Sequence, residues 1–154
     1  MSTQNINVLY LDDEQSNLVS FKANFRRDFN VMCASTPDEA FKVLESEDIH
    51  VVISDHKMPE MTGVQFFERI SVTHSDVIRI LLTGFTDIET VVEAINRGQV
   101  YRYFSKPMDP EEIRDTVISA YQFYQASKET RATYEDILFE NEQLEFQLRQ
   151  RLLS

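Results

Sequence analysis

Side chains that could bind an ion or a phosphoryl group follow four separate apolar segments of this sequence. Asp12 and Asp13 come directly after the first of these segments, and Asp55 follows the third. Thr83 and Lys106 follow the fourth and the fifth. Three carboxylates that meet in one place repel one another and raise their pKa values unless a cation lies among them. Oxygen ligands of this kind select a hard cation such as Mg²⁺, which shares its coordination sphere with phosphate oxygens.

The remaining two side chains suit the same chemistry. Lys106 carries a flexible point charge that can neutralise one phosphoryl oxygen, and the Thr83 hydroxyl can donate a hydrogen bond to another. A carboxylate nucleophile next to Mg²⁺, an ammonium group and a hydroxyl is what the formation of an aspartyl phosphate requires. Any one of these residues alone would be weak evidence, since acidic residues after strands often only cap turns. The hypothesis therefore depends on the fold bringing them together.

The apolar segments have the lengths and compositions of strands, and helical patterns lie between them. Strands are predicted at residues 6–11, 31–34, 49–54, 77–82 and 100–105. A helical period follows the first strand, and further helices are predicted to begin after Thr36, Gly63, Thr86 and Asp109, with Gly98 ending the fourth. The order is a repeated strand–helix unit, which predicts an α/β fold, a (βα)5 doubly wound parallel sheet covered by helices on both faces.

This fold class predicts where the polar residues lie. In open parallel sheets, the groups at the carboxyl ends of the strands face the crevice in which ligands bind. Because every candidate residue follows a strand, we expect all of them at one edge of the sheet. Asp55 ends the most apolar strand and is expected at the centre of that edge.

Composition narrows the functional classes. The chain of 154 residues carries a formal charge of −11, which argues against a nucleic-acid or anionic-membrane surface because both need clustered Lys and Arg. No apolar run approaches the length of a membrane span. Cys33 is the only cysteine, so no intrachain disulfide is possible, and a reduced thiol fits a cytoplasmic location. We expect a cytoplasmic protein without nucleic-acid or membrane contacts.

Five short motifs resemble the receiver domain of two-component response regulators. They are Asp12-Asp13-Glu14, Ile53-Ser54-Asp55 with Met58-Pro59 and Gly63, Leu82-Thr83-Gly84, and Lys106-Pro107. The resemblance covers residues ~5–125, and the motifs stand in the order and spacing of that family. It implies a flavodoxin-like sheet of strand order 2-1-3-4-5. It also implies phosphotransfer to Asp55 from a histidine kinase or a phosphotransfer protein, and a phosphoacceptor signalling domain rather than an enzyme.

The same resemblance assigns roles to individual residues. It implies that Mg²⁺ is bound by Asp13, Asp55 and the backbone carbonyl of Lys57, with Asp12 acting mostly through water. The resemblance also implies that Lys106 and Thr83 are catalytic residues. It implies a cis peptide bond between Lys106 and Pro107.

Thr83 and an aromatic residue of the fifth strand are the implied switch, which transmits phosphorylation to the face formed by the fourth helix, fifth strand and fifth helix. Tyr103 is the expected aromatic because alternation places it on the same face as Ser105. Tyr101 remains a rival for this role, since the turn into the fifth strand is one residue longer than usual.

Residues 126–154 are predicted to form a C-terminal helical extension. Residues 111–154 contain neither Gly nor Pro, which permits one long helix. Apolar residues recur from Tyr134 in an approximate a/d heptad pattern that continues through Ile137, Leu144 and Leu148, with Asn141 at an a position. We expect a parallel coiled coil that makes a homodimer, or a linker to an output domain. A single exposed amphipathic helix is the alternative.

Three functions remain open at this point. The first is a phosphorylation-controlled signalling module that dimerises through its C-terminal helix. The second is a Mg²⁺-dependent phosphohydrolase that turns over through an aspartyl phosphate, although His56 and Lys57 leave no acid two residues after Asp55 to protonate a leaving group. The third is a structural dimerisation module with a vestigial receiver. The presence of all five site residues argues against the third.

Overall fold

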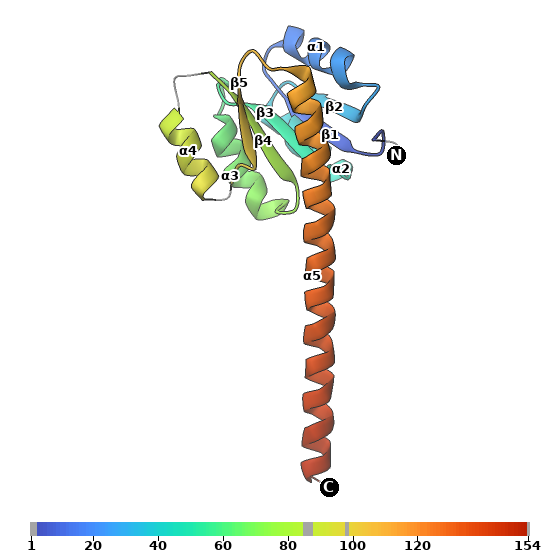
Figure 1. Cartoon of the computed structure of the whole chain (residues 1–154). Helices are drawn as coiled ribbons and strands as arrows, with labels where there is room; N and C mark the ends of the chain where they lie inside the picture. The colour runs from blue at the N-terminus through green and yellow to red at the C-terminus, as the bar shows by residue number, and fades with distance from the viewer. Residues whose placement is uncertain (1–2, 85–87, 98, 154) are drawn as a thin grey trace. The chain divides into compact units, whose positions relative to one another are not determined.

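The computed structural model contains five strands and five helices in alternation, and it describes residues 3–84, 88–97 and 99–153 (Figure 1). The strands are β1 (Asn7–Leu11), β2 (Asn30–Ala34), β3 (Val51–Asp55), β4 (Ile78–Thr83) and β5 (Arg102–Ser105). The helices are α1 (Gln15–Phe25), α2 (Pro37–Ser46), α3 (Gly63–Thr73), α4 (Ile88–Asn96) and α5 (Pro110–Leu153). The predicted cap at Thr86 and the predicted stop at Gly98 lie outside the described residues.

All strand pairs are parallel, and their order is β2-β1-β3-β4-β5. This confirms the predicted flavodoxin-like sheet. The central strand β3 is buried along its whole length, because β1 and β4 pair with its two edges and helices cover its two faces. Parallel sheets covered in this way have almost continuous apolar strands. Asp55 is the last residue of β3 and therefore stands where an apolar core reaches the surface.

Two apolar cores hold the sheet between its helices. One contains side chains of α1 and α5 with Tyr10, Ile53 and Leu82 from the strands. The other contains side chains of α2, α3 and α4 with Leu9 and Val52. Neighbouring residues of β1 and β3 enter opposite cores, as the alternation of side chains along a strand requires.

Most predicted elements are confirmed, with differences at their ends. The fifth strand begins at Arg102, not at Val100, because Val100 is buried in the second core as part of the preceding turn. Val19 belongs to the helical period that follows the first strand, but 61% of it is exposed. Thr36 caps α2 as predicted, since its side chain accepts a hydrogen bond from the Glu39 amide.

The third helix was predicted to begin after Gly63, but Gly63 is itself the first residue of α3. Its amide donates to the His56 carbonyl at 2.8 Å, which ties α3 to the segment just after Asp55. A Cβ atom at position 63 would lie 2.6 Å from the Asp55 carbonyl oxygen and 2.6 Å from Leu81 Cδ1. The close approach of the α3 backbone to the backbone of Asp55 therefore requires a glycine at position 63.

Replacement of Gly63 by Ala should destabilise the protein. The added methyl group must displace the Asp55 backbone, and overpacking of this kind costs about 1–3 kcal/mol in the free energy of unfolding. Urea unfolding followed by circular dichroism measures the difference. Gly84→Ala is the matched control, because a Cβ there meets nothing within 4 Å. Equal stabilities for the two variants would contradict the prediction.

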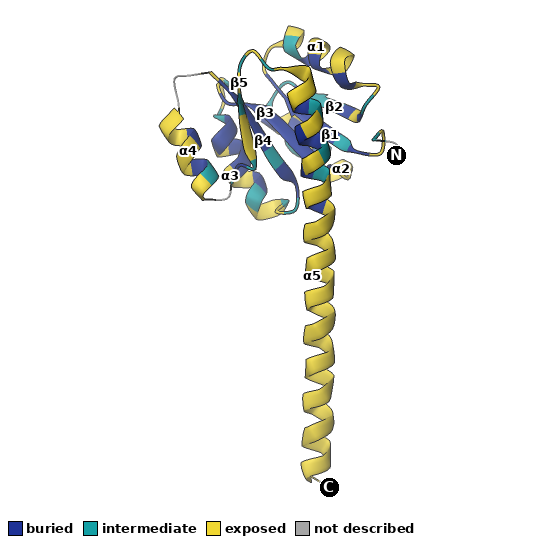
Figure 2. Cartoon of the chain, viewed as in Figure 1, coloured by how far each residue is buried: buried dark blue, intermediate teal, exposed yellow. Residues whose placement is uncertain are grey.

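The described chain divides into two compact units, Met1–Tyr124 and Gln125–Ser154. The second unit consists of the later part of α5, and all of its described residues are exposed (Figure 2). The predicted joint at residues 125/126 lies beside this division, while the separate roles of the two parts stay a prediction. Within the described residues, no helix combines the length and the apolar character needed to cross a membrane.

Candidate functional site

The sheet brings the predicted acidic residues together at the carboxyl ends of β1 and β3. Carboxylate oxygens of Asp12, Asp13 and Asp55 all lie within 4.8 Å of one another. Asp12 is fully buried and Asp55 is 7% exposed, whereas Asp13 is exposed to solvent. Among the described residues this is the group that could hold a metal ion. Its donors are all carboxylate oxygens, which fit a hard divalent cation such as Mg²⁺.

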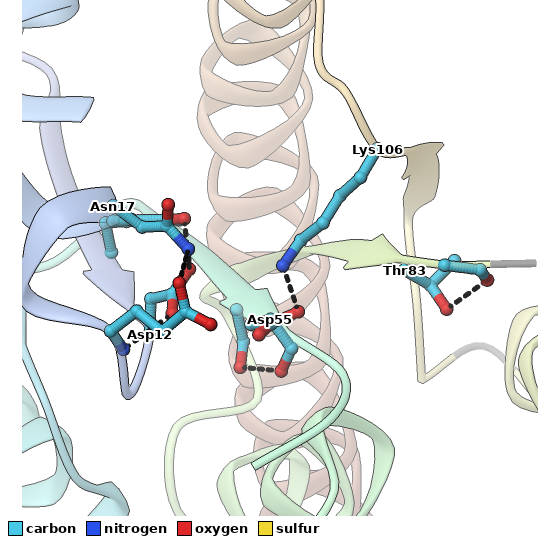
Figure 3. A network of polar contacts seen from close by, with 9 residues as sticks. Asp12, Asn17, Asp55, Thr83 and Lys106 are labelled. Carbon is cyan, nitrogen blue, oxygen red and sulfur yellow. Dashed lines mark hydrogen bonds and ion pairs between the residues drawn. The ribbon is translucent and has the colours of Figure 1, made fainter. Parts of the chain in front are cut away.

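Lys106 reaches the same group from the segment that follows β5. Its Nζ lies 2.8 Å from Asp55 Oδ1, and Figure 3 shows the side chain pointing toward Asp55 from the opposite side to Asp12. The backbone amide of Lys106 donates to the Thr83 carbonyl at 3.0 Å, so the β4–β5 ladder continues up to the lysine. The Lys106-Pro107 peptide bond is cis, as predicted.

The charges of the group do not balance. Burial raises the pKa of the Asp55 carboxyl, the hydrogen bond and charge of Lys106 oppose this, and the charges of Asp12 and Asp13 add to it. Burial would lower the pKa of Lys106, but the hydrogen bond and charge of Asp55 outweigh it, so the pKa is raised. The amine therefore stays protonated. One ammonium faces three carboxyl groups, and a divalent cation would restore neutrality.

Asp12 is held by three hydrogen bonds. Its Oδ1 accepts from the Glu14 amide at 3.0 Å, and its Oδ2 accepts from the Tyr10 hydroxyl at 2.7 Å and from Asn17 Nδ2 at 3.1 Å. Burial raises the pKa of Tyr10, and the hydrogen bond to Asp12 raises it further, so the phenol stays protonated. Sequence reasoning missed Tyr10 and Asn17. In the sequence, Tyr10 looks like one more core residue of an apolar strand. No motif or spacing indicates that its hydroxyl donates a hydrogen bond to Asp12.

Thr83 lies one residue beyond the pairing partner of Asp55, since β3 and β4 place Asp55 opposite Leu82. Its side chain is buried, and its hydroxyl donates to the Gly84 carbonyl at 2.9 Å. Figure 3 shows Thr83 apart from the group formed by Asp12, Asp55 and Lys106. In this structure the threonine is thus near the site but directed elsewhere.

The other predicted site residues lie around this edge. Lys57 is exposed two residues after Asp55, and its carbonyl stays a predicted metal ligand. Tyr103 is 44% exposed on β5, while Tyr101 packs on Phe123 of α5 with ring centroids 5.4 Å apart. The two candidates for the switch aromatic therefore differ: Tyr101 is held against α5, and Tyr103 is on the exposed side of the edge strand.

Comparison with known proteins decides the family. A family model described as the response regulator receiver domain matches residues 8–118. The chain belongs to this family. Receiver domains of response regulators are signalling domains that work with histidine kinases or phosphotransfer proteins and bind Mg²⁺ at an aspartate cluster, and the receiver assignment made from five sequence motifs is confirmed.

Similar curated proteins are transcriptional regulators. The hydrogenase transcriptional regulatory protein HoxA of Bradyrhizobium diazoefficiens is 32% identical over 130 residues, covering 84% of this chain and 27% of that protein. HoxA of Cupriavidus necator is 32% identical over 120 residues, covering 78% of this chain and 25% of that protein. The receiver described here thus spans about a quarter of the length of these relatives.

Solved structures of proteins with other names share the fold. A crystal structure of an adenylate cyclase from Rhodopirellula baltica is 27% identical with a TM-score of 0.81, covering 85% of this chain and 98% of that chain. The receiver domain of an HD domain-containing protein from Pseudomonas fluorescens is 28% identical with a TM-score of 0.76, covering 84% of this chain and 96% of that chain. The same fold thus occurs in solved structures of proteins with different names.

Proposed function

We propose that this receiver accepts a phosphoryl group on Asp55 from a histidine kinase or a phosphotransfer protein, in a reaction that depends on Mg²⁺. The observation that carries the proposal is the placement of the Asp55 carboxylate, at the end of a buried strand, with Lys106 Nζ 2.8 Å from Oδ1 and two further carboxylates close by. This arrangement combines a fixed nucleophile with a fixed positive charge.

The residues of the site divide the chemistry between them. An Asp55 oxygen attacks the phosphorus atom, the bond from phosphorus to the donor nitrogen breaks, and the donor imidazole retains the electron pair of that bond and takes up a proton. As the donor approaches, Lys106 must shift from the Asp55 carboxylate toward a phosphoryl oxygen, so that its charge stabilises the transition state of this step. Burial of Asp55 keeps the nucleophile in one orientation while the donor approaches.

The proposed magnesium ligands are Asp13, Asp55 and the Lys57 carbonyl, with Asp12 acting mostly through water. When bound, Mg²⁺ supplies positive charge that offsets both the carboxylates and the incoming phosphoryl oxygens. Asp13 suits direct binding because it is exposed and can adjust its orientation. The buried Asp12, held by three donors, suits an indirect contact.

The proposed output is a change at the face of α4, β5 and α5. Thr83 is next to the site and is expected to turn its hydroxyl from Gly84 to a phosphoryl oxygen, which alters the space that Tyr103 can occupy on β5. Tyr101 remains the alternative aromatic. The relatives that are named transcriptional regulators support a role for this receiver in controlling the output of a longer protein.

Incubation of the chain with acetyl phosphate and Mg²⁺, or with beryllofluoride and Mg²⁺, tests the proposal. One stable modification per chain, located on Asp55 by mass spectrometry, supports the signalling function. Continuous release of inorganic phosphate at many turnovers would instead support the phosphohydrolase. A chain that takes up neither reagent would be a structural module with a vestigial receiver.

We also propose that residues 126–154 make a parallel homodimer. The later part of α5 exposes a stripe of apolar side chains that are all at least half exposed: Tyr134, Ile137, Leu144 and Leu148. A helix that shows such a stripe to water buries it favourably against a second copy. Asn141, at an a position in this stripe, favours two parallel strands in one register.

Replacement of both Leu144 and Leu148 by Glu should turn the dimer into a monomer. Four carboxylates would then meet in the seam of the coiled coil, where charges lose their hydration. Light scattering of the full chain gives the mass. Gln143→Glu with Gln150→Glu adds the same charge outside the stripe and should leave the dimer intact. A wild-type chain that is already monomeric would refute the coiled coil and favour a single exposed helix.

A further inference from the structure

The Tyr10 hydroxyl joins the core of the domain to its acidic site. Tyr10 lies on β1, is 1% exposed, and stacks its ring on Phe21 of α1 with centroids 4.1 Å apart. Its hydroxyl reaches past the apolar layer and donates to Asp12 Oδ2 at 2.7 Å. Packing alone does not require this oxygen, because a Phe side chain would fill the same space.

The hydrogen bonds of Asp12 determine what it can still bind. An ionised carboxylate offers about four acceptor positions on its two oxygens. The Glu14 amide occupies one position on Oδ1, and Tyr10 and Asn17 occupy two on Oδ2. About one position is left, on Oδ1. Asp12 therefore has a single lone pair available for the site, and its three hydrogen-bond donors determine the direction of that lone pair.

The three donors differ in rigidity. Asn17 is on the half-buried surface of α1 and also donates to Glu14 at 3.4 Å, so its amide is shared between two acidic residues. Tyr10 is held by its ring inside the core and has only its hydroxyl direction to adjust. Of the two side-chain donors to Oδ2, the tyrosine is thus the one that can fix Asp12 with respect to the sheet.

We propose that Tyr10 is a positioning residue that orients Asp12 for Mg²⁺ and thereby sets the affinity of the receiver for this ion. The inference rests on the proposed function, since it takes the acidic group to be the magnesium site. Asp12 acts on the ion mostly through water in the proposed site, and outer partners of this kind, with the groups that orient them, commonly change metal affinity 10–100-fold when they are removed. We expect a loss of that size without the Tyr10 hydroxyl.

Tyr10→Phe in the full chain tests the inference. The variant keeps the ring and its stack on Phe21 and removes one oxygen atom. Isothermal titration with MgCl₂ should show an affinity at least about tenfold weaker than that of the wild type. Phosphorylation by acetyl phosphate should need correspondingly more Mg²⁺ and should reach the wild-type level when the ion is saturating.

Two matched variants separate positioning from packing. Tyr124→Phe removes a hydroxyl from another buried tyrosine, which packs on His50 at the opposite end of β3 from Asp55, and should leave Mg²⁺ affinity unchanged. Phe21→Leu weakens the ring stack but leaves the hydroxyl, so it should lower the thermal midpoint with Mg²⁺ affinity within about twofold of the wild type.

Several results would overturn the inference. These are unchanged or tighter Mg²⁺ binding by Tyr10→Phe, an equal loss of affinity in Phe21→Leu, or a Tyr10→Phe chain that does not fold, since the hydroxyl would then serve the fold and not the site. Failure of the proposed function looks different: the wild-type chain itself would bind no Mg²⁺ or would not be modified on Asp55.

Discussion

Asp55→Asn is expected to abolish covalent phosphorylation of the receiver. An amide is a far weaker nucleophile than a carboxylate, and it brings no negative charge to the ion. Acetyl phosphate with Mg²⁺ should add one phosphoryl group to the wild-type chain and none to the variant, as read from intact mass. Asp38→Asn removes an exposed carboxylate of α2 and should be modified like the wild type. Modification of the Asp55→Asn chain would mean that another residue is the acceptor.

The same substitution should stabilise the folded chain when Mg²⁺ is absent. Because the pKa of Asp55 is raised in the folded protein, its ionised form at neutral pH costs stability. This cost declines as the pH falls below the raised pKa and is gone below the ordinary carboxyl pKa of the unfolded chain. Asn resembles the protonated carboxyl in shape. The thermal midpoint of Asp55→Asn should therefore exceed that of the wild type at neutral pH in the presence of a chelator, and the difference should shrink toward acid pH.

Lys106→Met should separate ion binding from phosphorylation. The variant keeps an unbranched side chain, shorter by one atom, but removes the charge that lies 2.8 Å from Asp55 Oδ1. Loss of one preorganised positive group typically costs about 10²–10³-fold in rate, so phosphorylation should slow by that factor. Mg²⁺ should bind at least as tightly as before, because one competing positive charge has left the carboxylates.

The phosphorylation rate of Lys106→Met is measured by stopping the reaction with acetyl phosphate at successive times and determining the phosphorylated fraction. Calorimetric titration gives the Mg²⁺ affinity. Lys42→Met removes an exposed charge from α2 and should change neither quantity. A parallel fall in ion binding and phosphorylation would contradict the prediction, because it would show that the lysine holds the site together and does not act on the phosphoryl group.

Much of the fold followed from the sequence. The alternation of apolar strands with capped helices predicted the parallel sheet, and the resemblance to receivers supplied the strand order that the structure confirms. The ends and faces of elements were less predictable, because apolar residues also occur outside strands and apolar helix faces. Val100 is buried in the segment before β5, and Val19 is exposed on α1. The capping box of Thr62 and Gln65 was overlooked although its spacing is visible in the sequence.

The candidate site was predictable where it depends on strand ends and less so where it depends on side-chain contacts. Asp12, Asp13, Asp55 and Lys106 meet because each lies at the carboxyl end of a parallel strand, and the pattern of the sequence predicts those strand ends. The hydrogen bond from Tyr10 depends on how far one ring extends from the core, and a periodic pattern carries no information about that distance. The direction of the Thr83 hydroxyl is undetermined by sequence for the same reason.

Asp55 ends a strand that is well protected from local opening, whereas Lys106 follows a strand that is not. β3 is paired on both edges and buried throughout, while β5 is a short edge strand with three exposed residues. Local opening of a protein starts where few buried contacts oppose it, so amide hydrogens of β5 should exchange well before those of β3. Brief fraying of that edge would carry Lys106 away from the carboxylates and return it, while Asp55 keeps its place.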